Sequence, residues 1–143
     1  MPISDAHVGK TYPPTQPYEV TRGKIAEFAA ALGDPHQAYA GAAPIAPPTF
    51  AAVLAAEAWG ALFADPELDL QLKRTIHYDQ AFGFVRPLRA GDEVTATLTI
   101  DKVRRRGDTA FITVSVLLAT TAGETVCTAT STLLHTWPSE DAS

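Results

Sequence analysis

The sequence predicts an α+β domain in which a curled antiparallel sheet wraps around a helix. Two observations support this prediction. Apolar residues in the first half recur with a helical period, whereas those between residues 75 and 137 alternate with the period of a strand. This separation of helices from strands along the chain is typical of α+β proteins. The 143 residues suffice for a single domain with a buried core, over residues 1–143.

The first predicted helix covers residues 21–33, TRGKIAEFAAALG. Its apolar face follows the spacing i, i+3, i+4, i+7 and consists of Ile25, Phe28, Ala29 and Leu32. Thr21 can cap the N-terminus, and Gly33 can end the helix in the left-handed conformation that other residues avoid. We expect the sheet to wrap around this helix.

A second helix is predicted for residues 49–64, which are rich in alanine and apolar on most faces. Pro47 and Pro48 precede it, at the end of a helix where a missing N–H group costs least. The segment DPELDLQ then breaks the helix.

Four antiparallel strands are predicted within residues 74–88, 92–103, 109–120 and 125–137. The connections RPLRAGD, RRRGD and TAGE contain the glycine or aspartate that tight turns favour. Residues 104–106 are interpreted as a solvated hairpin tip, with a phosphate site as the alternative. Residues 1–17 are expected to form an extended, proline-rich arm that leads into a short strand. Residues 138–143 are expected to form a flexible tail.

The composition excludes several classes of function. A net charge of -5 without a basic stripe argues against nucleic acid, and no apolar run approaches the ~18 residues of a membrane span. The first residues lack a signal pattern, so we expect a cytoplasmic protein. Cys127 is the single cysteine, which excludes an intrachain disulfide. The four histidines lack metal-ligand spacing and no nucleotide-binding motif occurs, so neither metal nor cofactor is expected.

Three segments in a fixed order resemble a known family. They are YEVTRGKIAEFAAALGDPHQAY, IAPPTF and HYDQAFGFVRPLRAGDEV, and the resemblance covers roughly positions 8 to 137. Together they resemble the MaoC-like branch of the hot-dog fold, which contains R-specific enoyl-thioester hydratases and 3-hydroxyacyl-thioester dehydratases. Within that branch the chain is most similar to the HadA-like subunit of (3R)-hydroxyacyl-ACP dehydratase, a binding half that is paired with a catalytic sister subunit.

The resemblance implies a signature Gly-Asp-x-Asn-Pro-hydrophobic-His at the end of the first helix. Gly33 and Asp34 match it, His36 stands at the Asn position, and Tyr39 stands at the position of the catalytic histidine. Active relatives need a proton acceptor and donor near neutral pH, which histidine supplies. A tyrosine, with an ordinary pKa of ~10, is a poor base there.

A second departure concerns the oxyanion donor. Active relatives carry an Ile-Ala-His-Gly-type segment whose glycine N–H faces the thioester oxygen, whereas this chain has Ile45-Ala46-Pro47-Pro48. Proline has no N–H to donate. The connection between Tyr39 and Ile45 is shorter than in relatives, and a shift of the alignment would bring His36 toward the catalytic position.

The candidate catalytic residues are therefore Asp34 and His36, with a turn residue and a solvated loop histidine as the respective alternatives. The candidate substrate-binding residues are Tyr39, Pro48, Thr49, Phe50 and Trp59. The aromatic residues of the second helix are first of all expected to be core, which is compatible with an apolar wall for an acyl chain. His77 and Asp79 are expected on one strand face, where they would form hydrogen bonds in a dimer interface.

The leading functional hypothesis is a substrate-binding, catalytically weak subunit of a 3-hydroxyacyl-thioester dehydratase. The runner-up is a self-sufficient hydratase or dehydratase with a rearranged Asp34/His36 dyad. A third hypothesis is an acyl-thioester-binding protein without catalytic activity. The expected partners are an acyl-CoA or acyl-ACP thioester and a second hot-dog subunit, in a homodimer or heterodimer joined edge to edge.

Overall fold

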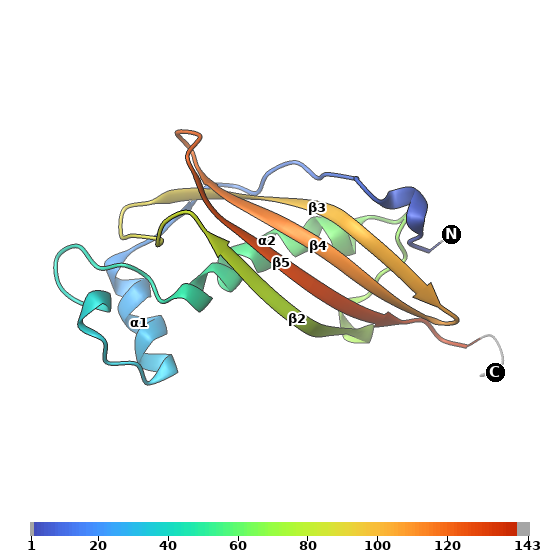
Figure 1. The fold of residues 1–143 in the computed structure, drawn as a ribbon, viewed down its shortest axis with the longest axis horizontal. Coiled ribbons are helices and arrows are strands. Elements are labelled where there is room, and N and C mark those ends of the chain that lie inside the picture. Colours follow the sequence, from blue (N-terminus) through green and yellow to red (C-terminus); the bar gives the residue numbers. More distant parts are fainter. Residues whose placement is uncertain (1, 140–143) are drawn as a thin grey trace.

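A five-stranded antiparallel sheet in the order β1-β3-β4-β5-β2 curls around one long helix (Figure 1). The computed structural model describes residues 2–139, so residues 140–143 of the predicted tail lie outside the described residues. The strands are β1 (Tyr18–Glu19), β2 (Thr75–Phe84), β3 (Glu93–Arg106), β4 (Thr109–Thr120) and β5 (Thr125–Thr136). The helices are α1 (Arg22–Leu32) and α2 (Ala51–Ala64), with 3-10 turns η1 (Asp5–His7), η2 (Gln37–Tyr39), η3 (Pro48–Phe50) and η4 (Leu72–Arg74). The predicted α+β class with its antiparallel sheet is confirmed.

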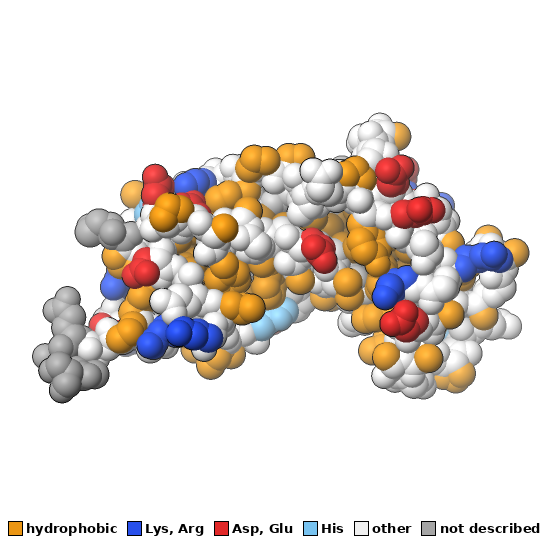
Figure 2. Space-filling model, turned by 180° about the vertical axis from the view of Figure 1, so that it is seen from behind, with side chains coloured by type: hydrophobic (Ala, Val, Ile, Leu, Met, Phe, Trp, Pro, Cys, Tyr) orange, Lys and Arg blue, Asp and Glu red, His pale blue; other side chains and the backbone are white. Residues whose placement is uncertain are grey.

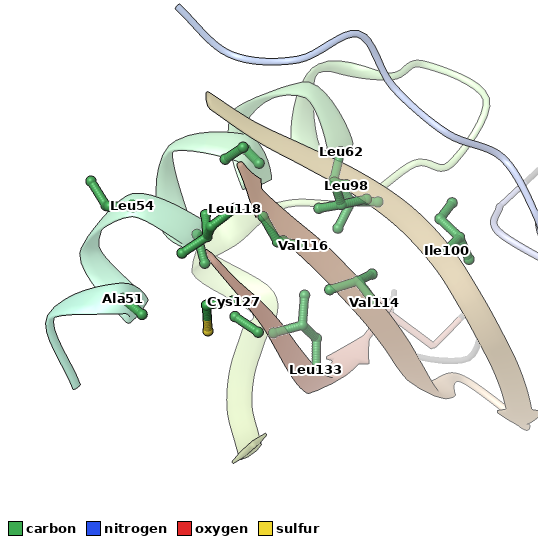
Figure 3. Close-up of a cluster of buried hydrophobic side chains, with 14 of the residues drawn as sticks. Ala51, Leu54, Leu62, Leu98, Ile100, Val114, Val116, Leu118, Cys127 and Leu133 are labelled. Atoms are coloured by element: carbon green, nitrogen blue, oxygen red, sulfur yellow. The ribbon is translucent and has the colours of Figure 1, made fainter. Parts of the chain in front are cut away.

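Alternation along the long strands divides the sheet into a core face and a solvent face. The buried residues of β3 and β4 are Val94, Ala96, Leu98, Ile100, Val103, Ala110, Ile112, Val114, Val116 and Leu118. Figure 3 shows side chains of this set, with Leu62 of α2 next to Leu98 of β3. The periodicity of the sequence therefore matches the side of the sheet that is buried.

The helix at the centre of the fold is α2, which corrects the expectation that the sheet wraps around residues 21–33. Five residues of α2 are buried, namely Ala51, Leu54, Ala55, Ala58 and Leu62, and the helix packs on β3, β4 and β5. In α1, the buried residues are Ile25 and Ala29, and this helix packs mainly on η2. The physical reason is composition, because α2 is apolar on most faces and α1 carries a charged face.

The residues that cap α1 are the two that the sequence predicts. The hydroxyl of Thr21 accepts a hydrogen bond from the N–H of Lys24 at 3.1 Å, and Gly33 ends the helix with φ of 68°. The side chain of a non-glycine residue would be strained in that conformation. Gly33 thereby directs the chain into the connection that leads to α2.

Strand β2 is an edge strand with an irregularity near its start. It pairs with β5, but the register shifts between His77 and Asp79, which pair with the neighbouring residues Leu133 and Thr132. Neighbouring residues of a strand face opposite sides, so His77 and Asp79 do not share a face and that expectation was wrong. The extra residue is Tyr78, whose side chain is 65% exposed.

The N-terminal arm lies along β3 and is held at the end of α2. The N–H of Tyr12 donates to the carbonyl of Leu98 at 3.0 Å. The carboxylate of Asp65 accepts hydrogen bonds from Lys10 Nζ and the Tyr12 hydroxyl, each at 2.6 Å. These two hydrogen bonds lower the pKa of Asp65 to about 2. The turn η1 interrupts the arm, where extended chain was expected.

His135 on β5 is fully buried. Its Nε2 accepts a hydrogen bond from the N–H of Gln71 at 3.0 Å, and its ring packs on Trp137 with centroids 4.4 Å apart. Among the described residues, Nδ1 is buried without a hydrogen-bond partner. Burial lowers the pKa of His135 below its usual 6.5, because a charged ring is costly away from water.

Replacing Leu62 by alanine should lower the free energy of unfolding by about 2–5 kcal/mol, because the side chain is fully buried beneath the sheet. Leu32→Ala on α1 is the matched control, since Leu32 is 50% exposed and its replacement should change stability by less than about 0.5 kcal/mol. Urea unfolding measures both. Equal losses would contradict the central position of α2.

Stability should decrease as the pH falls from about 7 to about 5, because the unfolded chain binds a proton at histidine near pH 6.5. Burial lowers the pKa of His135 in the folded chain, so the folded chain binds this proton less readily than the unfolded chain. The resulting contribution to the free energy of unfolding is fully present above pH 6.5 and is lost as the pH falls below it. His135→Gln keeps an acceptor and should flatten the slope, whereas His36→Gln, at an exposed site, should not. Urea midpoints between pH 5 and 8 test this, and equal slopes in both variants would contradict it.

Candidate functional site

A cavity of about 470 Å³ opens between the α1–α2 connection and the end of β2. Hydrogen bonds join its two walls, since the N–H of Ala46 donates to the carbonyl of Leu88 at 2.8 Å. The lining residues are His36, Ala38, Tyr39, Ile45, Ala46, Pro48, Phe84, Val85, Arg86 and Pro87. Most of them are apolar, as is typical of sites for small organic ligands.

Asp34 and His36 are both engaged in a turn. Asp34 Oδ1 accepts a hydrogen bond from the N–H of His36 at 3.0 Å, and His36 Nδ1 accepts one from the N–H of Ala38, also at 3.0 Å. Both side chains are exposed, and His36 reaches the cavity wall. A dyad would require each side chain to exchange its backbone partner for the other, so the present geometry is that of a turn.

Tyr39 stands at the centre of this region. Its ring is half-buried and lines both the cavity and a neighbouring hollow of about 570 Å³ near the start of α1. The ring lies against His36, with centroids 5.6 Å apart. Tyr39 thereby both packs on the core and borders the cavity.

The start of the helix that faces the cavity has few backbone donors. Pro47 and Pro48 have no N–H, and the N–H of Phe50 donates to the carbonyl of Pro47 at 2.9 Å. The N–H of Ala51 is directed to the carbonyls of Pro48 and Thr49. A helix N-terminus normally presents free N–H groups to an anion or oxyanion. Here the two prolines have no N–H group, and the N–H groups of Phe50 and Ala51 are bound to carbonyls within the turn.

Arg86 forms part of the second wall and is neutralised by two carboxylates. It donates from Nη1 and Nη2 to Asp92 at 2.8 and 3.0 Å, and from Nε to Glu124 at 2.6 Å. These hydrogen bonds raise the pKa of Arg86 above its usual value. Burial alone would raise the pKa of Asp92, but the hydrogen bonds from Arg86 and the N–H of Arg89 outweigh it and lower that pKa. Arg86 therefore fixes the wall.

The other predicted binding residues lie elsewhere. Phe50 is fully buried, with its ring 5.3 Å from that of Phe28, so it is core and does not line this cavity. Thr49 is exposed at the start of α2 and is absent from the lining. Trp59 lies two to three turns further along α2, with its ring edge-on to His77 at 4.9 Å. Tyr39 and Pro48 are the two candidates that the fold brings together.

Residues 84–87 form a wall that sequence analysis did not single out. The segment was interpreted as the end of a strand and a turn, and its Arg-Pro pair was the available signal. Within residues 2–139, no cluster of three His, Cys, Asp or Glu side chains could hold a metal ion. No described helix is long and apolar enough to cross a membrane.

Comparison with known sequences places most of this chain in one family. Residues 6–129 match the model of the FAS1-like, dehydratase domain region. A UPF0336 protein of Cutibacterium acnes is 57% identical over 142 residues, which cover 99% of this chain and 100% of that protein. A UPF0336 protein of Saccharopolyspora erythraea is 41% identical, with coverage of 99% and 96%.

Solved structures show the same architecture. A MaoC-like dehydratase superposes with a TM-score of 0.81 at 27% identity over 92% of this chain, which spans 43% of that longer chain. A chain of the HadBC (3R-hydroxyacyl-ACP dehydratase) complex from Mycobacterium tuberculosis superposes with a TM-score of 0.76 at 28% identity, covering 90% of this chain and 96% of that one. This chain therefore belongs to the FAS1-like dehydratase family and has the MaoC-like hot-dog fold.

Proposed function

We propose that this chain is the substrate-binding, catalytically weak subunit of a (3R)-hydroxyacyl-thioester dehydratase in fatty-acid or related acyl-chain biosynthesis. One observation carries the proposal. Tyr39 and Pro48 lie together in the wall of the apolar cavity. The resemblance places the catalytic histidine and the oxyanion-binding glycine at these two positions, so the cavity keeps its apolar surface and lacks both reactive groups.

The chemistry explains why a partner is required. Dehydration removes a proton from C2 of the thioester and the hydroxyl group from C3, so that water leaves and a C2–C3 double bond forms. A base must take the C2 proton, an acid must protonate the departing hydroxyl, and N–H groups must stabilise charge on the thioester oxygen. Tyr39 is a weak base at neutral pH and Pro48 donates no hydrogen bond. In the proposed assembly, this chain holds the acyl chain and the partner supplies the reactive groups.

The free edge of β2 supports such a partner. The strand has ten residues and is the last strand of the sheet, so within residues 2–139 it pairs with β5 on one side and its other edge is unpaired. A long unpaired edge is usually covered in the native assembly. The similar Mycobacterium tuberculosis chain is part of a two-component HadBC complex, and we infer that β2 joins a second hot-dog subunit to form a continuous sheet.

The purified chain alone should not hydrate a short enoyl-CoA measurably above the buffer rate, even at high protein concentration. Activity should appear when a hot-dog partner with an intact Asp-His pair is added. In that complex, Asp34→Asn and His36→Ala should each retain at least about a third of the rate, because both side chains serve the turn. The loss of enoyl-thioester absorbance in the ultraviolet follows the reaction.

The opposite result would identify the runner-up function. A clear rate from the chain alone that disappears in both Asp34→Asn and His36→Ala would mean that these side chains form a rearranged dyad. Thioester binding without activity in any pairing would instead indicate a binding protein without catalytic activity.

Filling the cavity should weaken thioester binding. Ala38 is half-buried in the cavity wall, and Ala38→Trp should raise the Kd for a 3-hydroxyacyl-CoA by about tenfold or more, since the indole occupies the space of the acyl chain. Ala40→Trp, which points to the neighbouring hollow, is the matched control. Isothermal titration measures both, and equal effects would argue against this cavity as the binding site.

A further inference from the structure

The solvent face of the sheet has one region that differs from the rest. Along β3, β4 and β5 this face is lined by hydroxyl side chains, which are Thr95, Thr97, Thr99, Thr113, Ser115, Thr128, Thr130 and Thr132. Near the β3–β4 hairpin the pattern changes to aromatic, aliphatic and basic residues. This end of the sheet lies away from α1, beside the chain termini (Figure 1).

The residues of this region lie in one row across four strands. Arg104 pairs with Phe111, Phe111 with Leu134, and Leu134 with Ile76. The guanidinium of Arg104 lies over the ring of Phe111 at 5.3 Å, and the ring of Tyr78 meets Phe111 edge-on at 5.7 Å. We call these five residues, with Lys102 and Arg106 on the same face of β3, the hairpin patch.

The hairpin patch combines exposed apolar surface with positive charge. Ile76 and Tyr78 are 62% and 65% exposed, and Lys102, Arg104 and Arg106 are also exposed. The patch contains three basic side chains and no acidic one, in a chain whose net charge is -5. Arginine and tyrosine are enriched at the energetic centres of protein interfaces. The charge makes an acidic partner complementary.

We propose that the hairpin patch docks the acidic surface of the carrier protein that delivers the acyl thioester. This inference rests on the proposed function and names the carrier. The patch is a row of side chains on an open sheet face and lines none of the cavities described above, so it suits a protein surface better than a nucleotide such as that of CoA.

The patch lies at the start of β2, to which Ile76 and Tyr78 belong, whereas Phe84 at the end of β2 lines the cavity. Two β2 strands that pair antiparallel along their length bring the start of one next to the end of the other. The patch of one subunit would therefore lie at the cavity end of the other, on the outer face of the sheet, whereas Phe84 pairs with the buried Cys127 on the face that α2 covers.

The test uses a bacterial acyl carrier protein that carries the phosphopantetheine group but no acyl group. Isothermal titration calorimetry measures the Kd of this carrier protein for the chain. Arg104→Glu/Arg106→Glu should raise the Kd by about tenfold or more, and Tyr78→Ala should weaken binding in the same direction. The matched control Arg22→Glu/Lys24→Glu reverses one exposed and one half-buried charge in the first turn of α1 and should leave the Kd unchanged. Leu117→Ala, 41% exposed on the same sheet face, is the apolar control.

A second arm separates this inference from the proposed function. The arginine variants should bind 3-hydroxyacyl-CoA as the unaltered chain does, and Ala38→Trp should bind the unacylated carrier protein normally. No binding of the carrier, or equal binding by the arginine variants, would overturn the docking role. Equal loss of carrier and CoA binding in the arginine variants would also overturn it and indicate a general phosphate site. Failure to bind any acyl thioester, with patch-dependent carrier binding intact, would instead overturn the proposed function.

Discussion

The packing of α2 against the curled sheet is the contact on which the rest of the molecule depends. Burial of its alanine and leucine side chains fixes the helix along β3, β4 and β5. Alanines let the helix approach the strands closely, and leucines fill the space that remains. With α2 fixed, the 3-10 turn η3 that precedes it places Pro48 opposite the end of β2, and the cavity forms between them. The view from behind shows apolar side chains across the middle of the molecule (Figure 2).

Prolines and local hydrogen bonds hold the segments around the cavity in place. Two prolines set the start of α2, the Asp34 and His36 side chains each hold a backbone N–H, and Arg86 is fixed by two carboxylates. The side chains of Asp34, His36 and Arg86 would be available for chemistry in a different arrangement. Here each one stabilises a turn or a wall, which agrees with the proposed substrate-binding role.

Sequence periodicity predicted the strands and both helices because one buried face per element leaves a direct pattern. It could not decide which helix is central, since a local pattern does not contain the contacts between distant elements. The side chain of Phe50 was placed in the binding site because aromatic residues fit both a core and an acyl site, and only the packing on Phe28 separates the two. The cavity wall at residues 84–87 depends on a long-range approach of two segments. The register shift at Tyr78 could not be predicted, because an inserted residue leaves no clear mark on the alternation of a short segment in which polar and apolar residues are mixed.

That inserted residue has a consequence for how the molecule recognises other chains. A bulge increases the local twist of a strand and shifts its hydrogen-bonding groups by one position. A flat strand of an unrelated protein can follow the edge of β2 only as far as Tyr78 before its donors and acceptors fall out of step. Only a chain whose own edge bends to match can remain paired over the full ten residues of β2. The bulge thus makes the edge of β2 a poor template for flat strands, which protects it from unselective pairing.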